Sequence, residues 1–473
     1  MSKGRERASA LAFMTRRTEA WYVAFAAANF VMGLSSILVP LKLDRVLVQG
    51  PGRLGILSTA ASSAAVLGSL VWGRLSDAVH RRKSFVVLSY AAIGCAHIGL
   101  ALASSFATLL LSNTLLSFFW VANASVAVLL VIEHAEHETW EMRISALNLS
   151  GAAGWLLGLI AGGIGVTPTL ATFSDRLGLQ VILVALAAIA WIAAGLGAWL
   201  VPGVLPKFTE RRFRGFRIAL GNLLTEAWRY SPLHLYHRFS LTRLLQLRRE
   251  TRLFLLASFF AFTGIGFFAV PLPLLLSQHL GYAPSRVFYS YVMLHAGIVI
   301  AYPLALHRIK KRGNRQVQIG ALSARILLFI LAGIVLWSSI RVSWMAAMPF
   351  MFSVGVSWSF FQLSGVALAS RLARPENRGL ALGTYNAVAG VSTVIAGVSS
   401  GFLAQNVGHF AAYGMAAILL VCAVFTLVRL PDPMKLAEAE RELSGEDVDF
   451  RMSRPEAGSA GEQARETEGR DSR

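Results

Sequence analysis

Charged side chains are scarce in this sequence, and acidic ones are the scarcest. Asp and Glu together number 25 in 473 residues, against 44 Lys and Arg, and the four types make up only 15% of the chain. An ordinary soluble domain is about a quarter charged. The missing charge argues against the two or three soluble domains that this length would otherwise predict.

Cysteine is nearly absent as well. Cys95 and Cys422 each lie inside an apolar stretch, whereas a disulfide scaffold or a thiolate metal site needs spaced, paired cysteines. We therefore expect two small buried side chains. No phosphate-cradling loop or nucleophile–base pair is present either, so we expect neither a metal nor a cofactor.

Long apolar runs are what the sequence has in abundance. Hydrophobic residues make up 55% of the chain, and several runs exceed the roughly 18 residues that cross a bilayer core. A bilayer offers the backbone no water, so such segments must be helices. The runs predict an all-α membrane protein with twelve spans, at 21–42, 54–75, 85–104, 107–132, 145–166, 178–201, 252–276, 286–307, 317–337, 343–370, 380–404 and 408–430.

The net charge of +19 first raises the question of nucleic acid. A nucleic-acid binder would line one groove with its Lys and Arg, but here they gather in alternate connections between spans. That alternation follows the positive-inside rule. It predicts a plasma-membrane protein with both termini in the cytoplasm and no nucleic-acid partner.

Three segments are predicted to lie outside the bilayer. A basic arm covers residues 1–20. The connection 203–250 has apolar residues at helical spacing among basic ones, which predicts an amphipathic helix on anionic headgroups, each basic residue adding about 1 kcal/mol; a docking site for a partner is the alternative. The charged tail 431–473 is expected to be largely disordered.

The two halves of the chain share markers at a nearly constant offset. The matched pairs are Arg53 with Arg286, Arg82 with Arg315, Arg143 with Arg378, and Trp120 with Trp358. The markers predict two six-helix repeats, at 1–202 and 251–430, joined by 203–250. Parallel repeats of this kind place a binding site between the halves at mid-depth and let the halves rock about it.

The connection after the second span carries a more specific pattern. It reads Gly73-Arg-Leu75-Ser-Asp77-Ala-Val-His80-Arg81-Arg82-Lys83 and resembles the signature loop of the major facilitator superfamily. Gly73, Leu75, Asp77, Arg81 and Arg82 match that loop, whereas His80 replaces its second glycine. Taken with the repeat, the resemblance covers the chain through about residue 430.

The resemblance implies the major facilitator fold, a small-molecule substrate, no enzymatic activity and a monomer. It also implies a cytoplasmic gate in which Asp77 meets the start of the eleventh span at Arg378, because a carboxylate is stabilised by an arginine or a helix N-terminus. A plain hydrophilic turn is the alternative. The equivalent loop of the second half has Lys310 where Asp77 would fall, so only one such gate is intact.

The resemblance also implies which residues line the cavity. In this superfamily the first, fourth, seventh and tenth spans surround the substrate, and here the fifth, eighth and eleventh add polar side chains. The candidates are Asn29, Asn113, Trp120, Asn123, Asn148, His295, Trp358, Gln362, Tyr385 and Asn386. Amides and indoles without fixed charge suit a neutral or amphipathic ligand.

The spans hold no carboxylate at mid-depth, and a buried carboxylate is the usual proton relay. His295 is the candidate that could replace it, because histidine titrates near physiological pH; a neutral histidine bonded between helices is the alternative, and His97 is expected to be of that kind. Arg325, the one charge inside a predicted span, is expected to reach the cytoplasmic surface along its own stem.

These features favour a secondary transporter that exports amphipathic or drug-like compounds by alternating access. Gly154, Gly158 and Gly162 are similar to a glycine ladder of drug–proton antiporters, although close helix packing explains the same spacing. Uptake of a neutral metabolite such as a sugar is the alternative. A membrane enzyme or sensor is a further alternative, in which the Glu and His of residues 133–141 could hold a metal.

We expect the substitution Asp77→Asn to reduce transport while the protein remains folded, since it removes the charge of the gate but not its shape. Transport into membrane vesicles, compared at equal amounts of monodisperse protein, measures the effect. Unchanged turnover would indicate that the loop is a hydrophilic turn with no role in gating.

Overall fold

The computed structural model describes residues 20–79, 82–134, 140–201, 247–338, 340, 342–373 and 378–431. Several sequence-based predictions lie outside these residues. They concern the basic arm, Arg81, nearly all of the connection 203–250, the tail from 432 onward, the side chains of the acidic and histidine cluster at 133–141, the surroundings of Gly73, and the side chains of Asp77 and Arg378.

Most of the described residues are helical, and the prediction of twelve membrane-capable helices is confirmed. The first six are α2 (Tyr22–Arg45), α3 (Pro51–Val79), α4 (Arg82–Leu102), α5 (Phe106–His134), α6 (Trp140–Thr172) and α7 (Asp175–Leu200). The seventh span comprises α11 (Arg249–Ala269), α12 (Leu272–Leu274) and the π-helical turn η3 (Leu275–His279). The last five are α13 (Pro284–Arg312), α14 (Asn314–Trp337), α15 (Trp344–Arg371), α16 (Arg378–Asn406) and α17 (His409–Val428).

The seventh span differs from the single helix predicted at 252–276. Pro271 and Pro273 lack the N–H that would continue a regular helix, and the chain resumes with a wide turn in which Leu280 N–H bonds the Leu275 carbonyl at 2.9 Å. Insertions of this kind re-aim side chains and are frequent at functional sites. Here the turn carries Gln278, which reaches the other half of the molecule.

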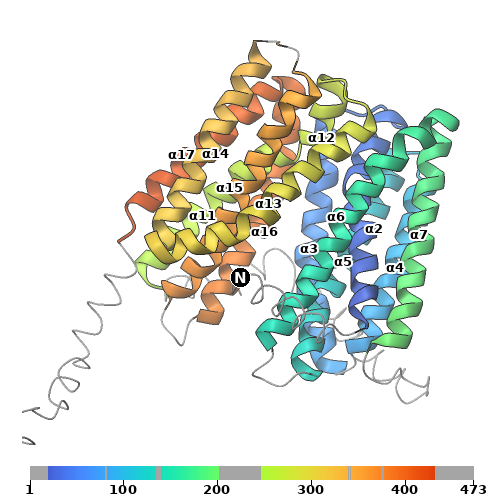
Figure 1. The fold of residues 1–473 in the computed structure, drawn as a ribbon, viewed down its shortest axis with the longest axis horizontal. Coiled ribbons are helices and arrows are strands. Elements are labelled where there is room, and N and C mark those ends of the chain that lie inside the picture. Colours follow the sequence, from blue (N-terminus) through green and yellow to red (C-terminus); the bar gives the residue numbers. More distant parts are fainter. Residues whose placement is uncertain are drawn as a thin grey trace, which may run out of the picture.

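The helices form two groups of six that stand side by side (Figure 1). We call the surface where α2 begins and α17 ends the terminal face, and the opposite surface, where α2 ends and α17 begins, the far face. Each helix runs from one face to the other, so every second connection lies at the same face. In Figure 1 the two groups meet near the far face and diverge toward the terminal face.

Glycines bring α6 against α2 in the first half. A methyl group added at Gly154 would overlap the Ala26 carbonyl, and one at Gly158 would overlap the Phe30 carbonyl. Backbones that approach this closely gain dispersion contacts, which replace the hydrophobic driving force that is absent between helices in lipid. Close packing therefore accounts for this part of the glycine ladder.

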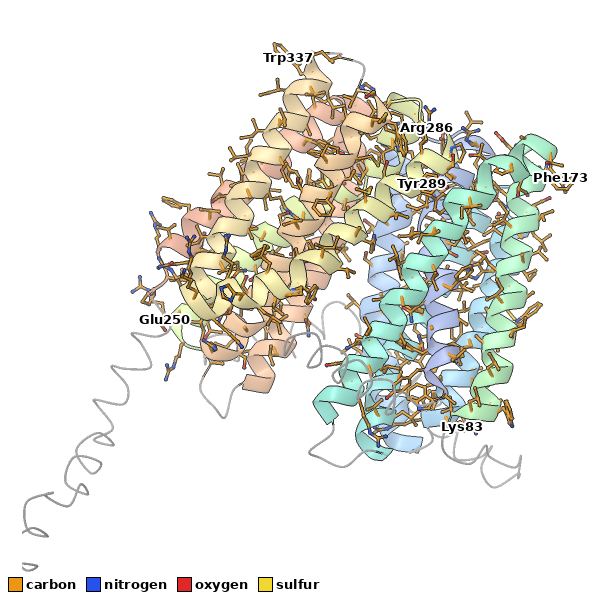
Figure 2. All side chains as sticks on the ribbon, viewed as in Figure 1. Lys83, Phe173, Glu250, Arg286, Tyr289 and Trp337 are labelled. Atoms are coloured by element: carbon orange, nitrogen blue, oxygen red, sulfur yellow. The ribbon has the colours of Figure 1, made fainter. Side chains whose placement is uncertain are left out.

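The same ladder continues into the contact between the halves. Gly162 lies against the ring of Phe288, and Gly163 against the ring of Tyr289, both on α13. Figure 2 shows Tyr289 and Arg286 near the far face, on the side of α13 toward the first half. One run of glycines thus serves two interfaces, the first within a half and the second between halves.

Hydrogen bonds join the halves near the far face. Gln278 Nε2 donates to Asp44 Oδ1 at 2.7 Å and to the Gln49 carbonyl at 3.2 Å. Gly52 N–H donates to Gln405 Oε1 at 2.9 Å, between α3 and α16. These contacts hold the far face together.

Two further hydrogen bonds join the two halves. Thr59 Oγ1 donates to the Val394 carbonyl at 2.9 Å. Ser285 N–H donates to Thr167 Oγ1 at 3.0 Å, between α13 and α6. Both pairs are still on the far-face side of the molecule, so the described conformation is closed at that face.

Buried cations depart from the sequence-based expectation. Arg325 does not reach a membrane surface: it is 2% exposed, its Nε donates to Ser357 Oγ at 3.1 Å and its Nη2 to the Val354 carbonyl at 2.8 Å. The prediction that it extends to the surface is wrong, because α15 supplies acceptors closer than water.

Lys42, at the end of the first predicted span, is a second buried cation. It belongs to α2, is 1% exposed, and donates to the carbonyls of Leu100 and Ala101, the latter at 2.8 Å. These are the unpaired carbonyls at the C-terminal end of α4, where the helix dipole favours positive charge.

The histidine and cysteine of α4 give opposite outcomes. His97 is fully buried, with Nε2 at 2.6 Å from Ser35 Oγ and Nδ1 at 2.7 Å from the Ile93 carbonyl, so the prediction of a neutral bonded histidine is confirmed. Cys95, expected to be buried, is exposed on the outer surface.

We expect Gly158→Ala to lower stability by about 1–3 kcal/mol, because its methyl group meets backbone that has no room to move. Gly165→Ala is the matched control on the same helix: a Cβ there meets nothing within 4 Å, and replacing a helical glycine by alanine is itself favourable by up to about 1 kcal/mol. Thermal unfolding of the two purified variants measures the difference; equal midpoints would contradict the packing assigned to the ladder.

Candidate substrate site between the halves

Three aromatic rings bridge the two halves at about the middle of the bilayer. Trp120 of α5 lies 6.4 Å from Trp155 of α6, centroid to centroid. Trp155 in turn stacks on His295 of α13, at 6.4 Å with the planes inclined by 27°. All three side chains are partly buried. We call these three rings the bridging stack.

The position of the bridging stack follows from the glycine ladder. Trp155 lies between Gly154 and Gly158, whose lack of side chains holds α6 against α2. The neighbouring face of α6 is then free to present a large ring to α5 and α13. The first half therefore offers two indoles at mid-depth, and the second half offers an imidazole.

The hydrogen bond of His295 defines its neutral tautomer. Nδ1 lies 2.9 Å from the Tyr291 carbonyl, which can only accept, so Nδ1 carries the proton. In the neutral ring Nε2 is then an acceptor. A protonated ring would donate from both nitrogens, so the site changes its hydrogen-bonding character with one proton.

Two polar groups near the bridging stack have no partner among the described residues. They are the Nε1 of Trp155 and the side-chain amide of Asn123, which is fully buried on α5 one turn from Trp120. A buried unsatisfied group costs about 1–3 kcal/mol, and groups of this kind cluster where a ligand or another conformation supplies the missing bond.

The second half contributes Trp358 and Gln362 of α15, both partly buried. The ring of Trp358 lies 5.6 Å from the guanidinium carbon of Arg325. Arg325 donates to Ser357 and Val354, so these two donors of the guanidinium are already bound within the second half.

The other predicted cavity residues do not all meet at this site. Asn29 is 7% exposed, and its Nδ2 donates to the Phe25 carbonyl of its own helix at 2.8 Å. Asn113 is partly buried, closer to the far face. Asn148 of α6 and Asn386 of α16 are exposed, nearer the terminal face, where the halves diverge.

Tyr385 belongs to the core of the second half. It is 2% exposed, its ring stacks on Phe254 at 5.7 Å and meets the edge of Phe262 at 5.4 Å, both on α11. This places its ring in the packing between α11 and α16. A sequence does not distinguish a tyrosine that packs between two helices from one that lines a cavity.

The described part of the gate is incomplete. Leu75 is buried, 4% exposed, and Arg82 is partly buried at the start of α4. Since Asp77 and Arg378 have no described side chains, the contact between them stays a prediction.

Trp155 was missed by sequence reasoning, although a signal was present. The glycines of the ladder pack one face of the helix against its neighbour. A tryptophan between them has no room at that interface, so its ring points toward a different helix. The break in the seventh span could also have been predicted, from Pro271 and Pro273.

Comparisons with known proteins agree with this arrangement. The family model of the Major Facilitator Superfamily matches residues 20–364 and 326–458. Sugar efflux transporter A of Escherichia coli (strain K12) is 24% identical over 440 residues, which cover 89% of this chain and 98% of that protein.

Solved structures share the fold at low sequence identity. A D-xylose–proton symporter superimposes with a TM-score of 0.66 at 14% identity, covering 88% of this chain and 98% of that one. The nucleoside transporter NupG gives a TM-score of 0.58 at 14% identity, covering 87% and 97%. With a family model that spans most of the sequence and a fold of twelve membrane-capable helices, this chain belongs to the Major Facilitator Superfamily and is a multi-pass membrane transporter of small molecules.

Proposed function

We propose that this transporter exports neutral, sugar-like solutes by alternating access, and that the bridging stack forms part of their binding site. The observation that carries the proposal is the stack itself: aromatic rings from both halves meet at mid-depth, beside polar groups that have no partner. A solute bound there touches both halves, so its binding can follow their rocking motion.

The chemistry of the site supports a neutral polyhydroxy ligand. Indole faces pack against apolar C–H surfaces, and their N–H groups bond oxygens. The imidazole of His295, the amide of Asn123 and the Nε1 of Trp155 can each bond a hydroxyl. The described carboxylates, Asp44, Asp175 and Glu250, lie at helix ends, so they offer no counter-charge to a cationic drug at mid-depth.

The similarity to a sugar efflux transporter supports sugars as the substrate class and export as the direction. This similarity favours sugars over the drug-like compounds that the glycine ladder suggests, since close packing accounts for that ladder. The alternation of basic connections supports placing the terminal face in the cytoplasm of the plasma membrane. The described conformation would then be open to the side from which an exporter loads.

The substrate class can be tested in inside-out vesicles with radiolabelled neutral mono- and disaccharides, their aryl glycosides, and cationic amphipathic dyes. We expect uptake of sugars or glycosides into these vesicles and none of the dyes. We expect Trp155→Ala to lower that uptake about tenfold or more, because the ring joins both halves of the site.

The matched control is Trp199→Ala, since Trp199 is 80% exposed on α7 and its loss removes an indole without touching the site. Trp155→Phe should retain part of the activity. Transport of the dyes without transport of sugars would indicate drug export instead. Equal activity of Trp155→Ala and Trp199→Ala would show that the bridging stack is not part of the binding site.

We expect His295→Gln to abolish driving by a pH gradient while sparing downhill exchange of substrate. Glutamine keeps hydrogen-bonding capacity but cannot take up a proton. Transport measured with and without an imposed gradient, in the same vesicles, separates the two activities. If gradient-driven transport persists, His295 serves packing only; if exchange is lost as well, it serves substrate binding.

A further inference from the structure

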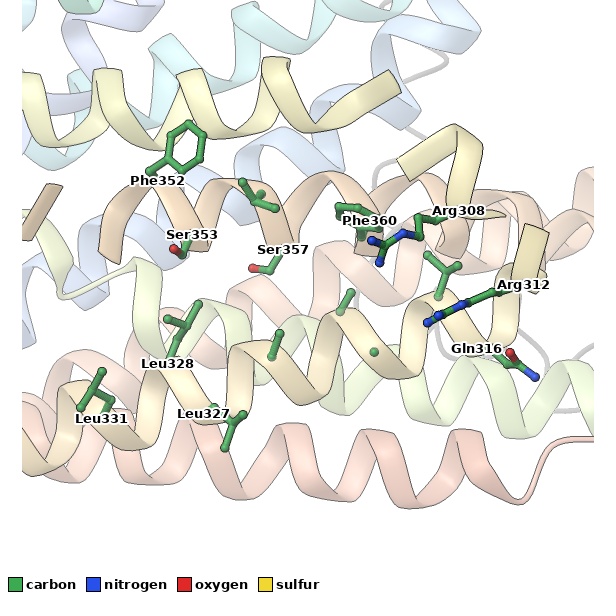
Figure 3. Close-up of a pocket in the computed structure, with 15 residues that line it drawn as sticks. Arg308, Arg312, Gln316, Leu327, Leu328, Leu331, Phe352, Ser353, Ser357 and Phe360 are labelled. Atoms are coloured by element: carbon green, nitrogen blue, oxygen red, sulfur yellow. The ribbon is translucent and has the colours of Figure 1, made fainter. Parts of the chain in front are cut away.

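A groove on the outer surface of the second half runs between α13, α14 and α15. Its volume is about 600 Å³. Figure 3 shows Arg308, Arg312 and Gln316 at one end, and Leu331 with Phe352 at the other. The groove belongs to a different surface from the bridging stack, since Trp120, Trp155 and His295 are not among its lining residues.

One end of the groove is basic and lies at the terminal face. Arg308 and Arg312 are four residues apart near the C-terminal end of α13, so they share one face of the helix. Both are exposed, and neither forms an ion pair with a described residue. Two unpaired guanidinium groups at a membrane surface form a geometry that phosphate oxygens fit well.

The rest of the groove is apolar and has the depth of one leaflet. Gly320, Ala324, Leu327 and Leu331 line it along α14. The eleven helical steps from Gly320 to Leu331 rise about 16 Å, which matches about 15 Å, half of the hydrocarbon core. The small side chains of Gly320 and Ala324 open the space, while Phe352 and Phe360 of α15 form the opposite wall.

A basic end at the headgroup level and an apolar channel of one leaflet's depth describe the shape of a single lipid. Polar groups inside the channel are already satisfied: Ser353 Oγ donates to the Pro349 carbonyl at 2.8 Å, and Ser357 Oγ to the Val354 carbonyl at 2.8 Å. These hydroxyls therefore need no hydrogen bond from a ligand in the channel, and an acyl chain is the matching occupant.

We propose that this groove binds an anionic glycerophospholipid from the leaflet at the terminal face, with its phosphate on Arg308 and Arg312 and one acyl chain along α14. The lipid bridges the end of α13 to α14 and α15. This site is separate from the headgroup contact predicted for residues 203–250, because it takes the tail as well as the head.

The test uses the purified full-length protein in detergent, with phosphatidylglycerol and phosphatidylcholine of identical acyl chains, and counts bound lipid by native mass spectrometry. We expect a preference of about tenfold or more for phosphatidylglycerol. Arg308→Gln with Arg312→Gln should reduce the binding of phosphatidylglycerol to the level of phosphatidylcholine. Lys310→Gln with Lys311→Gln is the matched control, removing the same charge from the same helix end but from residues that do not line the groove.

A second pair of variants tests the acyl channel without changing any charge. Ala324→Trp fills the groove and should reduce the binding of both lipids, whereas Ile330→Trp, at an exposed position outside the groove, should not. Equal losses from the lysine and arginine pairs would mean diffuse attraction to a basic surface and would overturn the proposal. Unchanged phosphatidylglycerol binding in Ala324→Trp would overturn it too, since the headgroup alone would then account for binding.

Discussion

A bilayer offers no hydrogen bonds, so each polar group within a span must find its partner inside the protein. Most of the described polar groups obey this constraint through neighbouring helices. Lys42 closes the carbonyl end of α4, Arg325 bonds α15, and His97 bonds Ser35 and its own helix. Against that background the unpartnered Nε1 of Trp155 is informative, because it lies where the two halves meet. An unpartnered indole N–H at the contact between the halves is available to a ligand or to another conformation.

Helix α6 connects the packing of the first half to the contact between halves. Its first glycines bring it against the backbone of α2, and Gly162 and Gly163 receive the rings of Phe288 and Tyr289 from α13. The two interfaces differ in kind. The first is a contact of backbone with backbone, and the second is a contact of aromatic rings with backbone.

The number of helices, the repeat and the family could be predicted from the sequence, because apolar length, charge alternation and one loop pattern are local properties. The site could be predicted only in part. Trp120 and His295 were candidates, but Trp155 was not, because a tryptophan next to glycines reads as packing until the direction of the helix is known. Tyr385 was a candidate too, and its ring packs on Phe254 and Phe262, contacts that a sequence does not show. Arg325 was placed at the membrane surface because a sequence shows the length of its stem but not the acceptors on α15.

The two buried cations also bear on what the transporter can carry. A lysine or arginine without a carboxylate partner would normally attract an anionic substrate. Here each cation donates to helix carbonyls or a serine hydroxyl, and the rings of Phe329 and Trp358 lie 5.9 Å and 5.6 Å from the Arg325 guanidinium carbon, where a ring face attracts a cation. Trp358 is therefore held on one side by Arg325 while its other surfaces remain partly exposed. Arg325 thus orients an aromatic ring, which together with the uncharged bridging stack suits the neutral solute that we propose.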